Sequence, residues 1–501
     1  MYELERRLAI ISVFDKTGLV EFCKSVTSHF DIVSTGKTAA LLMASQISVQ
    51  AVSDLTKFPE ILDGRVKTLH PLLLGGILGM KDHSDEMTKM NIQPFGLVVV
   101  NLYPFEKIIS RPHSETEALD NIDIGGVTLL RAAAKNYHEV LVVSSPEDYT
   151  RVSTAISNNE VTLELRKELA RKAFQHTMRY DAIISNYFSS SEELPSDFVI
   201  AFENPQNLRY GENLHQNAKY YLEQGKSPFY TQIHGKDISY NNLVDFQAAL
   251  GVLSGHEQPS CAIIKHTSPC GFASANDIET AFDHAFETDN LSAFGSVMGF
   301  NRPITERLAT KLNAMFIDAI IAPSYDQNAL GILKKKSKLI LCTLNPSDIQ
   351  KLSFRSIPNG ILVQTTDVHT ISEDDITVVS KRSPSPQELN DLLFAWKIVK
   401  YVKSNAAVIS THTRTVGIGV GQPSRIGAVE LALNRAGDRA RGAVMASDAF
   451  FPYRDSVDAA AARGITAIIA PGGSIRDKES IIAADEAGIA LVWSGHRAFL
   501  H

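Results

Sequence analysis

Two stretches of this sequence hold side chains that could do chemistry. "GRVKTLHP", residues 64–71, gathers an arginine, a lysine and a histidine in a chain whose formal net charge is −7. "IKHTSPCG", residues 264–271, sets Lys265 directly before His266. Histidine titrates near neutral pH and lysine can stabilise an oxyanion, so this pair suits general-base catalysis. Taken alone, each stretch is more typical of a solvated loop.

Two turns early in the chain could hold a phosphate group. "SVFDKTGL" (12–19) and "VSTGKTAAL" (33–41) each follow an apolar run and precede a helix-forming stretch, where free backbone N–H groups attract anions. Neither has the spacing of a Walker loop, so ATP hydrolysis is not indicated. With residues 64–71 they predict a pocket for one phosphate monoester, although a simple helix cap explains each turn alone. The residues concerned are Ser12, Lys16, Thr17, Ser34, Thr35, Gly36 and Arg65.

Short apolar runs alternate with helical stretches and would position these turns. Strands are predicted at 8–14, 30–35, 95–101 and 139–145. This alternation is typical of a parallel sheet in an α/β domain. A long helix is predicted near 164–188, and a linker follows at 189–197. The apolar stripe of that helix would be Leu165, Leu169, Phe174, Met178 and Ile183.

The rest of the chain carries a faint duplication. "SAFGSVMGF" is followed by "DAIIAP" (318–323), and "ASDAFFPYRD" is followed by "TAIIAP" (466–471). Two similar α/β units in tandem would explain the echo. The segment at about 331–399 interrupts it and is predicted to be connecting or helical-insert material.

Composition restricts the function classes. A chain of 501 residues indicates about two to four domains, and 44% hydrophobic with 21% charged residues is ordinary for a globular protein. We expect a cytoplasmic protein, because the sequence shows no signal peptide and no apolar run of spanning length. The negative net charge argues against a nucleic-acid partner. The cysteines are scattered and predict neither disulfides nor a zinc site; they are Cys23, Cys261, Cys270 and Cys342.

A series of motifs makes the sequence specific. In order, they are "GRVKTLHP", "NLYPF" (101–105), "DIGGVTLLRAAAKN" (123–136), "RYGEN" (209–213), "IKHTSPCG", "SNAAVI" (404–409), "VGIGVGQPSR" (416–425), "SDAFFPYRDSVDAA" (447–460) and "PGGSIRD" (471–477). The chain resembles the bifunctional purine-biosynthesis enzymes phosphoribosylaminoimidazolecarboxamide (AICAR) formyltransferase/IMP cyclohydrolase, and the resemblance covers essentially its whole length.

The resemblance implies a fold and a division of labour. Residues 1–196 would be a methylglyoxal-synthase-like parallel-sheet domain that closes the purine ring. Residues 197–501 would transfer a formyl group from 10-formyltetrahydrofolate to AICAR, giving formyl-AICAR. This part would contain two cytidine-deaminase-like α/β units, at about 197–330 and 400–501. The resemblance further implies a homodimer, and its chemistry requires no metal.

The cyclohydrolase site implied by the resemblance includes the basic cluster. Arg65 would hold the nucleotide phosphate, while Lys67 and Thr68 would lie beside the reacting carboxamide. Ring closure expels water, so it needs an oxyanion stabiliser and proton transfer to the departing hydroxyl. Lysines could supply the first and Tyr103 and Asp123 the second, and which group is the base stays open. The further residues placed in this site are Asn101, Tyr103, Asp123 and Lys135.

The transferase site implied by the resemblance centres on Lys265 and His266. The AICAR amine is a poor nucleophile, so His266 would remove its proton while Lys265 stabilises the tetrahedral oxyanion. Asn405 would orient the carboxamide and the histidine, and Asp448 would contact the folate. The residues placed at the AICAR nucleotide are Arg209, Tyr210, Gly295, Asp318, Arg425 and Arg497.

Some positions depart from the usual family pattern without removing a proposed catalytic side chain. The substituted residues are Lys37, Leu72, Leu73, Leu74, Leu214, Ala470 and Ala498. Two other functions stay open. A zinc nucleobase deaminase would need a second cysteine after the Pro269–Cys270 pair, and a non-catalytic nucleotide-binding protein would have no need of the Lys265–His266 pair.

Overall fold

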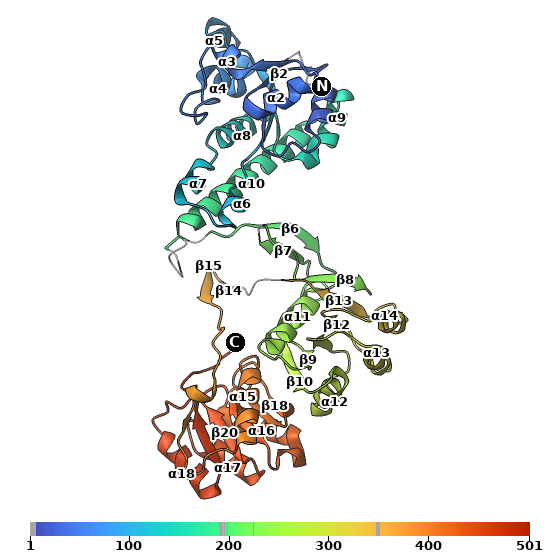
Figure 1. The fold of residues 1–501 in the computed structure, drawn as a ribbon, viewed down its shortest axis with the longest axis vertical. Helices are drawn as coiled ribbons and strands as arrows, with labels where there is room; N and C mark the ends of the chain where they lie inside the picture. Colours follow the sequence, from blue (N-terminus) through green and yellow to red (C-terminus); the bar gives the residue numbers. More distant parts are fainter. Residues whose placement is uncertain (1–6, 190–193, 195, 198, 224, 347–350) are drawn as a thin grey trace. The chain divides into compact units, whose positions relative to one another are not determined.

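The structure, a computed structural model, describes residues 7–189, 194, 196–197, 199–223, 225–346 and 351–501. The chain divides into two compact units, Met1–Ala201 and Phe202–His501 (Figure 1). Most of the linker predicted at 189–197 lies outside the described residues. Among the helices that are described, none combines the length and apolar composition needed to cross a membrane.

The first unit is built on a parallel sheet in the order β3-β2-β1-β4-β5. The strands are β1 (Arg7–Val13), β2 (Phe30–Ser34), β3 (Val49–Ala51), β4 (Phe95–Asn101) and β5 (Leu141–Val143). Every residue of β4 and of β5 is buried, as expected for a sheet covered by helices on both faces. The predicted strands and the α/β class are confirmed.

Ten helices connect or cover these strands in the described residues of the unit. They are α1 (Leu19–Val26), α2 (Gly36–Ala44), α3 (Val52–Thr56), α4 (Pro71–Leu78), α5 (Ser84–Lys89), α6 (Phe105–Ile109), α7 (Glu115–Asp120), α8 (Gly125–Lys135), α9 (Tyr149–Ser157) and α10 (Leu163–Phe188). The predicted long helix is α10, which packs against α8 and β5.

The predicted apolar stripe of α10 is wrong in its middle. Leu165 and Leu169 are buried, but Phe174 and Met178 are 38% and 56% exposed. The residues that continue the buried stripe are Ala173, Thr177 and Tyr180. Thr177 and Tyr180 carry hydroxyl groups that are hydrogen-bonded, so the packed face of α10 is less apolar than its sequence pattern indicates.

The second unit contains a twelve-stranded sheet in the order β16-β21-β20-β19-β17-β18-β10-β9-β11-β12-β13-β8. Its strands are β8 (Tyr230–His234), β9 (Ser260–Lys265), β10 (Ser268–Ser274), β11 (Val297–Phe300), β12 (Ala319–Ala322), β13 (Ile340–Leu344), β16 (Thr377–Val378), β17 (Ala407–Thr411), β18 (Arg414–Gly419), β19 (Val444–Ser447), β20 (Ala467–Ala470) and β21 (Ala490–Trp493). Two hairpins stand outside it, β6 (Phe202–Asn207) with β7 (Lys219–Glu223) and β14 (Leu352–Ile357) with β15 (Gly360–Thr365).

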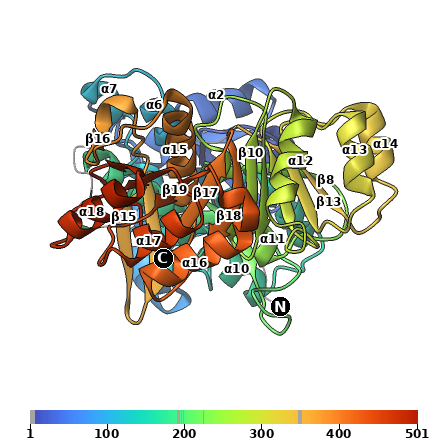
Figure 2. The same ribbon diagram turned by 90° about the horizontal axis from the view of Figure 1, so that it is seen from below.

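The sheet joins two repeats of one α/β arrangement. The first repeat runs from β8 to β13 with α11 (Tyr240–Leu253), α12 (Ile278–Thr288), α13 (Glu306–Asn313) and α14 (Gln327–Leu333). The second runs from β16 to β21 with α15 (Pro386–Val399), α16 (Arg425–Ala436), α17 (Asp455–Ala462) and α18 (Asp477–Ala487). Hairpins β9–β10 and β17–β18 meet where Ala273 pairs with Arg414. Figure 2 shows α12 beside β10 and α16 beside β18. The predicted tandem α/β units are therefore present.

The segment at about 331–399, predicted to be connecting or helical-insert material, contributes strands as well as helix α15. Its strands β13 and β16 belong to the sheet, β14 and β15 form a hairpin, and α15 opens the second repeat. The missed signal is the pair Pro358–Asn359, which forms the turn between the two strands, with Asn359 at φ 61°. Proline followed by asparagine with a positive φ is typical of a tight type II turn.

Candidate functional site

In the first unit, Asn101 closes the turn that follows β1. Its Oδ1 accepts hydrogen bonds from the N–H groups of Phe14 (2.6 Å) and Asp15 (2.8 Å), and its Nδ2 donates to the Asp15 carbonyl (3.0 Å). Lys16 donates from Nζ to the carbonyls of Val13 and Phe14, at 3.2 and 3.1 Å. Asn101 is the last residue of β4, so the sheet itself holds the turn in place.

The turn after β2 lies beside it, because β1 and β2 are adjacent and parallel. Ser34 Oγ donates to the Ile11 carbonyl at 2.6 Å, and the Thr35 hydroxyl donates to Glu60. Gly36 opens α2 with φ 53°. The predicted phosphate turns therefore meet at the carboxyl edge of the sheet, where α/β folds bind ligands. Glu60 is a contact that the sequence did not indicate.

The basic cluster supplies one exposed and two more sheltered side chains. Arg65 is 72% exposed and forms an ion pair with Asp120. Lys67 is half-buried, and Thr68 is 3% exposed. A Cβ placed on Gly125 would lie 2.5 Å from Thr68 Oγ1, so Thr68 touches the start of α8.

Asp123, immediately before α8, lies at the centre of this group. Its Oδ1 accepts from Gly126 N–H at 2.7 Å, and its own N–H donates to the Tyr180 hydroxyl at 2.8 Å. Burial raises the pKa of Asp123, while the Gly126 bond, the Lys67 charge and the Tyr103 N–H oppose this rise. Its carboxyl group can thus exchange a proton closer to neutral pH than an exposed aspartate.

Lys135 is the predicted residue that the structure does not bring to this group. It is exposed and ends α8, whereas Asp123 precedes the first residue of the same helix. Helix α8 has 11 residues, so with a rise of 1.5 Å per residue its two ends lie roughly 16 Å apart. Ser12, by contrast, is half-buried one residue before the end of β1, at the edge that carries both turns.

In the second unit, Lys265 and His266 stand at the β9–β10 turn. Lys265 Nζ donates to the carbonyls of Phe294 (2.6 Å) and Gly295 (3.2 Å). His266 is exposed, and both His266 and Thr267 have positive φ, 52° and 64°. A two-residue turn of this kind is tight, so it presents the imidazole at the end of the sheet.

Helix α11 brings polar groups to the same place. Asp318 accepts from Lys236 Nζ at 2.5 Å and from Asn242 Nδ2 at 2.7 Å. Asp245 accepts from Thr267 N–H at 2.7 Å. Sequence reasoning missed Lys236, Asn242 and Asp245. The available signal was the capping box formed by Ser239 and Asn242, which places this face of the helix.

Arg209 and Tyr210 lie at the start of α11. The Tyr210 hydroxyl accepts from Arg209 Nη2 at 2.8 Å, and the guanidinium stands 4.6 Å from the Tyr210 ring centre. Arg209 N–H donates to the Ile238 carbonyl, and Tyr240 N–H donates to the Tyr210 carbonyl. The structure therefore groups five predicted AICAR or catalytic residues around one helix and one turn. They are Arg209, Tyr210, Lys265, His266 and Asp318, with Gly295 beside Lys265.

The second repeat holds the remaining predicted residues. Arg425 donates from Nη2 to Asn405 Oδ1 at 2.7 Å and forms a buried ion pair with Asp448. Asp448 also accepts from Ser404 Oγ (2.5 Å) and Ala406 N–H (3.0 Å). We expected Asp448 to contact the folate. Its side chain is fully buried and is therefore not placed to make that contact. It supports Asn405 through Arg425.

Arg497 lies near this group on the closing segment of the chain. Its guanidinium stands 4.5 Å from the Phe499 ring centre, and the next residue, Ala498, donates its N–H to the Asp448 carbonyl at 2.9 Å. Leu500 N–H donates to Ser404 Oγ at 3.1 Å. Ala498 is 5% exposed, so this departure from the family pattern fills a buried position.

The two groups of the second unit lie at one edge of the sheet. Strand β9 runs antiparallel to β10, β10 to β18, and β18 to β17. The end of β9, at Lys265, therefore lies at the same edge as the start of β17, after Asn405. Three strand spacings separate them by about 14 Å. Among the described residues, no hydrogen bond or ion pair joins the two groups.

The other departures and the cysteines lie apart from these contacts. Lys37 and Leu214 are exposed, whereas Ala470 is buried. All four cysteines are free and buried. The described part of the chain contains no group of three His, Cys, Asp or Glu side chains arranged to hold a metal ion.

Comparison with known proteins places the chain in a family. Residues 133–435 match the family described as AICARFT/IMPCHase bienzyme, and residues 18–128 match the MGS-like domain. The chain is 45% identical to the "Bifunctional purine biosynthesis protein PurH" of Oceanobacillus iheyensis over 98% of its length and 99% of that protein. It is also 45% identical to the protein of the same name from Bacillus mycoides, over 99% of this chain and all of that one.

A solved structure, that of ForH, aligns with 37% of this chain and 98% of its own, at 30% identity and a TM-score of 0.34. We draw nothing from so low a score. The relatives and the two matched families together cover almost the whole chain. The chain belongs to the AICARFT/IMPCHase bienzyme family of purine biosynthesis, as an AICAR formyltransferase and IMP cyclohydrolase.

Proposed function

We propose that the two activities divide between the two units. Met1–Ala201 would close the purine ring, and Phe202–His501 would transfer the formyl group from 10-formyltetrahydrofolate. The observation that carries this division is that each unit has its own group of convergent polar side chains at a sheet edge. One group surrounds Asp123 and the other surrounds the β9–β10 turn.

In the first unit, the two turns and Arg65 would hold the phosphate of formyl-AICAR. The carboxamide nitrogen attacks the formamide carbon, and water leaves after the ring has formed. Lys67 would stabilise the negative charge that develops on the formamide oxygen. Asp123, with a raised pKa, and Tyr103 would relay protons to the departing hydroxyl. Lys135 has no assigned step, because this unit does not bring it to Asp123.

In the second unit, Arg209, Tyr210 and Asp318 would hold AICAR beside the turn. His266 would take the proton of the AICAR amine as its nitrogen bonds to the formyl carbon. Lys265, fixed by two carbonyl oxygens, would stabilise the oxyanion and then protonate the departing folate nitrogen. Asn405, held by Arg425, would orient the carboxamide. These side chains supply the acid–base chemistry of the transfer without a metal ligand set.

We also propose that formyl transfer requires a homodimer. Large apolar side chains stand exposed beside Lys265: Leu291 is 85% and Phe294 65% exposed. A second copy would cover such surface. On dilution, the specific transferase activity should fall as the dimer dissociates. A monomer by sedimentation that keeps full transferase activity would contradict the dimer. The free, buried cysteines support the cytoplasm as the compartment.

Two single variants of the full chain test the division. His266→Ala should reduce formyl transfer by roughly 100-fold or more and leave cyclisation of supplied formyl-AICAR intact. Lys67→Ala should do the opposite. Each variant is the control for the other, because the unchanged activity reports an intact chain. If either variant loses both activities equally while remaining folded, the division is wrong.

A further inference from the structure

The β9–β10 turn has a counterpart in the second repeat. Lys265, His266 and Thr267 correspond to Thr411, His412 and Thr413 at the β17–β18 turn. His412 and Thr413 have φ 49° and 53°, close to the values of His266 and Thr267. Positive φ is unfavourable for residues other than glycine, so each turn needs support from its surroundings.

An aspartate at the same place in the preceding helix supports each turn. Asp245 of α11 accepts from Thr267 N–H at 2.7 Å, and Asp391 of α15 accepts from Thr413 N–H at 2.9 Å. Both helices start from a serine N-cap with a capping box, Ser239 and Ser385. Holding the turn is therefore a property of the repeat and is independent of the proposed chemistry.

The two aspartates differ in what their second oxygen does. Asp391 is 3% exposed, and its Oδ2 accepts from Gln387 Nε2 at 3.1 Å. Asp245 is half-buried, and within the described residues its carboxylate accepts only the Thr267 bond. One oxygen of Asp245 is thus left for the proposed site, whereas both oxygens of Asp391 are used.

Charged groups of the proposed site surround Asp245. Burial raises its pKa; the Thr267 bond and the charges of His266 and Lys265 lower it, and the charge of Asp318 raises it. Asp318 is itself paired with Lys236. The carboxylate therefore lies where a positive charge on His266 would be stabilised.

We propose that Asp245 is a positioning residue for formyl transfer. One oxygen fixes the turn that presents His266, and the other supplies the negative charge beside which this imidazole takes up the amine proton. The proposal rests on the proposed role of His266 as base. The proton passes from the AICAR nitrogen to His266 as the new N–C bond forms, and Asp245 itself takes no proton.

Asp245→Asn in the full chain separates the two roles, because the amide oxygen can still accept from Thr267 N–H while the charge is lost. Asp391→Asn is the matched control at a turn that lacks the lysine. We expect Asp245→Asn to lower kcat of formyl transfer about tenfold and to move the rising limb of its pH profile to lower pH. KM for AICAR and the cyclohydrolase activity should change by less than about twofold. Asp391→Asn should change none of these by more than that.

Asp245→Glu restores the charge and should return the rising limb of the pH profile towards its original position. This variant also tests the role of the Asp245 charge if Asp245→Asn does not fold. Equal effects of Asp245→Asn and Asp391→Asn, whether small or large, would overturn the proposal. His266→Ala separates this failure from a wider one. If His266→Ala abolishes transfer but the two asparagine variants match, only the role of Asp245 is wrong; if it transfers normally, the base assignment is wrong as well.

Discussion

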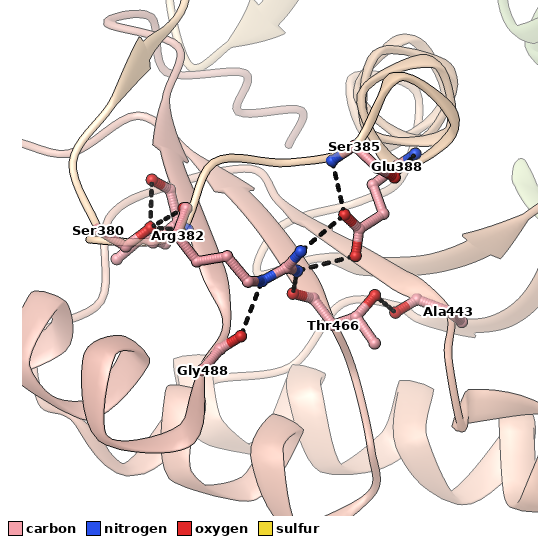
Figure 3. A network of polar contacts seen from close by, with 8 residues as sticks. Ser380, Arg382, Ser385, Glu388, Ala443, Thr466 and Gly488 are labelled. Atoms are coloured by element: carbon pink, nitrogen blue, oxygen red, sulfur yellow. Dashed lines mark hydrogen bonds and ion pairs between the residues drawn. The ribbon is translucent and has the colours of Figure 1, made fainter.

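Arg382 and Glu388 form a two-point ion pair within the second repeat (Figure 3). Arg382 Nη1 and Nη2 donate to the two carboxylate oxygens at 3.0 and 2.8 Å, and Nε donates to the Gly488 carbonyl at 2.8 Å. Glu388 also accepts from Ser385 N–H at 2.8 Å, which completes the capping box of α15. Arg382 thus ties the start of this helix to the loop before β21.

The same places in the first repeat carry a different charge arrangement. Lys236 takes the place of Arg382, Asn242 that of Glu388, and Asp318 that of Thr466. In the second repeat the carboxylate belongs to Glu388 on the helix, whereas in the first repeat it belongs to Asp318, the residue before the strand. In the second repeat both carboxylate oxygens of Glu388 bind Arg382. In the first repeat the Asp318 side chain remains 25% exposed and can be reached by a ligand.

The pair makes stability depend on acid pH. Hydrogen bonds from Arg382 lower the pKa of Glu388 from 4.5 to about 2. A lowered carboxyl pKa adds stability above the unfolded value, and this is lost as the pH falls from about 4.5 to about 2. Glu388→Gln should lower the free energy of unfolding at pH 7, measured in urea, by about 1 kcal/mol. The effect is no larger because Arg382 is partly exposed and solvent screens the pair. The difference from wild type should shrink across that window. A difference that is constant with pH would contradict the assignment.

Gly126 tests the position of Asp123. A Cβ on Gly126 would lie 2.6 Å from Asp123 Oδ2, so Gly126→Ala must displace the carboxylate. We expect cyclohydrolase activity to fall about 100-fold, as a small misplacement of a reacting group can cost that much, with formyl transfer unchanged. Gly331→Ala is the control, because nothing lies within 4 Å of a Cβ there and the residue is in helix α14. Normal cyclisation by Gly126→Ala would remove Asp123 from the site.

The buried Arg425–Asp448 pair should be costly to break. The two side chains are 5% and 0% exposed. Asp448→Ala leaves an arginine buried without its partner and should destabilise the second unit by about 3–5 kcal/mol in urea unfolding. Asn405→Ala should lose formyl transfer with a much smaller change in stability. The prediction fails if Asp448→Ala unfolds at the same urea concentration as wild type.

The thiols should be unreactive in the folded chain. Burial raises the pKa of Cys23, Cys270 and Cys342 to about 12, and that of Cys261 well above its usual value. Thiolate is the reactive form, so a disulfide reagent at pH 8 should label none of the four cysteines in the native protein and all of them in urea. Rapid labelling of one thiol in the native protein would contradict this prediction, because it would show that the structure around that cysteine opens to solvent.

Local patterns in the sequence predicted the first unit well. The four predicted apolar runs became strands, because a parallel sheet covered on both faces demands such runs, whereas the three-residue strand β3 was not predicted. The proximity of Lys265 and His266 was also predictable, because residues adjacent in the sequence stay together in any fold. The residues that were missed act across long separations in the chain. Asp245 meets Thr267, and Glu60 meets Thr35, only after the sheet has formed.

The wrong predictions have equally local causes. Phe174 and Met178 fit a helical stripe by spacing, but the packed face of α10 is set by the approach of α8. Asp448 lies in a family motif, and only its burial reveals that it supports Asn405. Lys135 follows Asp123 in a single motif, but Lys135 ends α8 whereas Asp123 precedes it, so the length of the helix separates their backbones.

The contact between β10 and β18 makes the two repeats inseparable. Each of these strands covers the hydrogen-bonding edge of the other. A repeat cut free would expose a row of unpaired backbone groups, which is a template for aggregation. The first repeat therefore needs the second as its partner in the sheet, although the β17–β18 turn of the second repeat has Thr411 in place of the lysine. The two repeats thus cover each other's strand edges at this contact, while only one of the two turns carries the lysine.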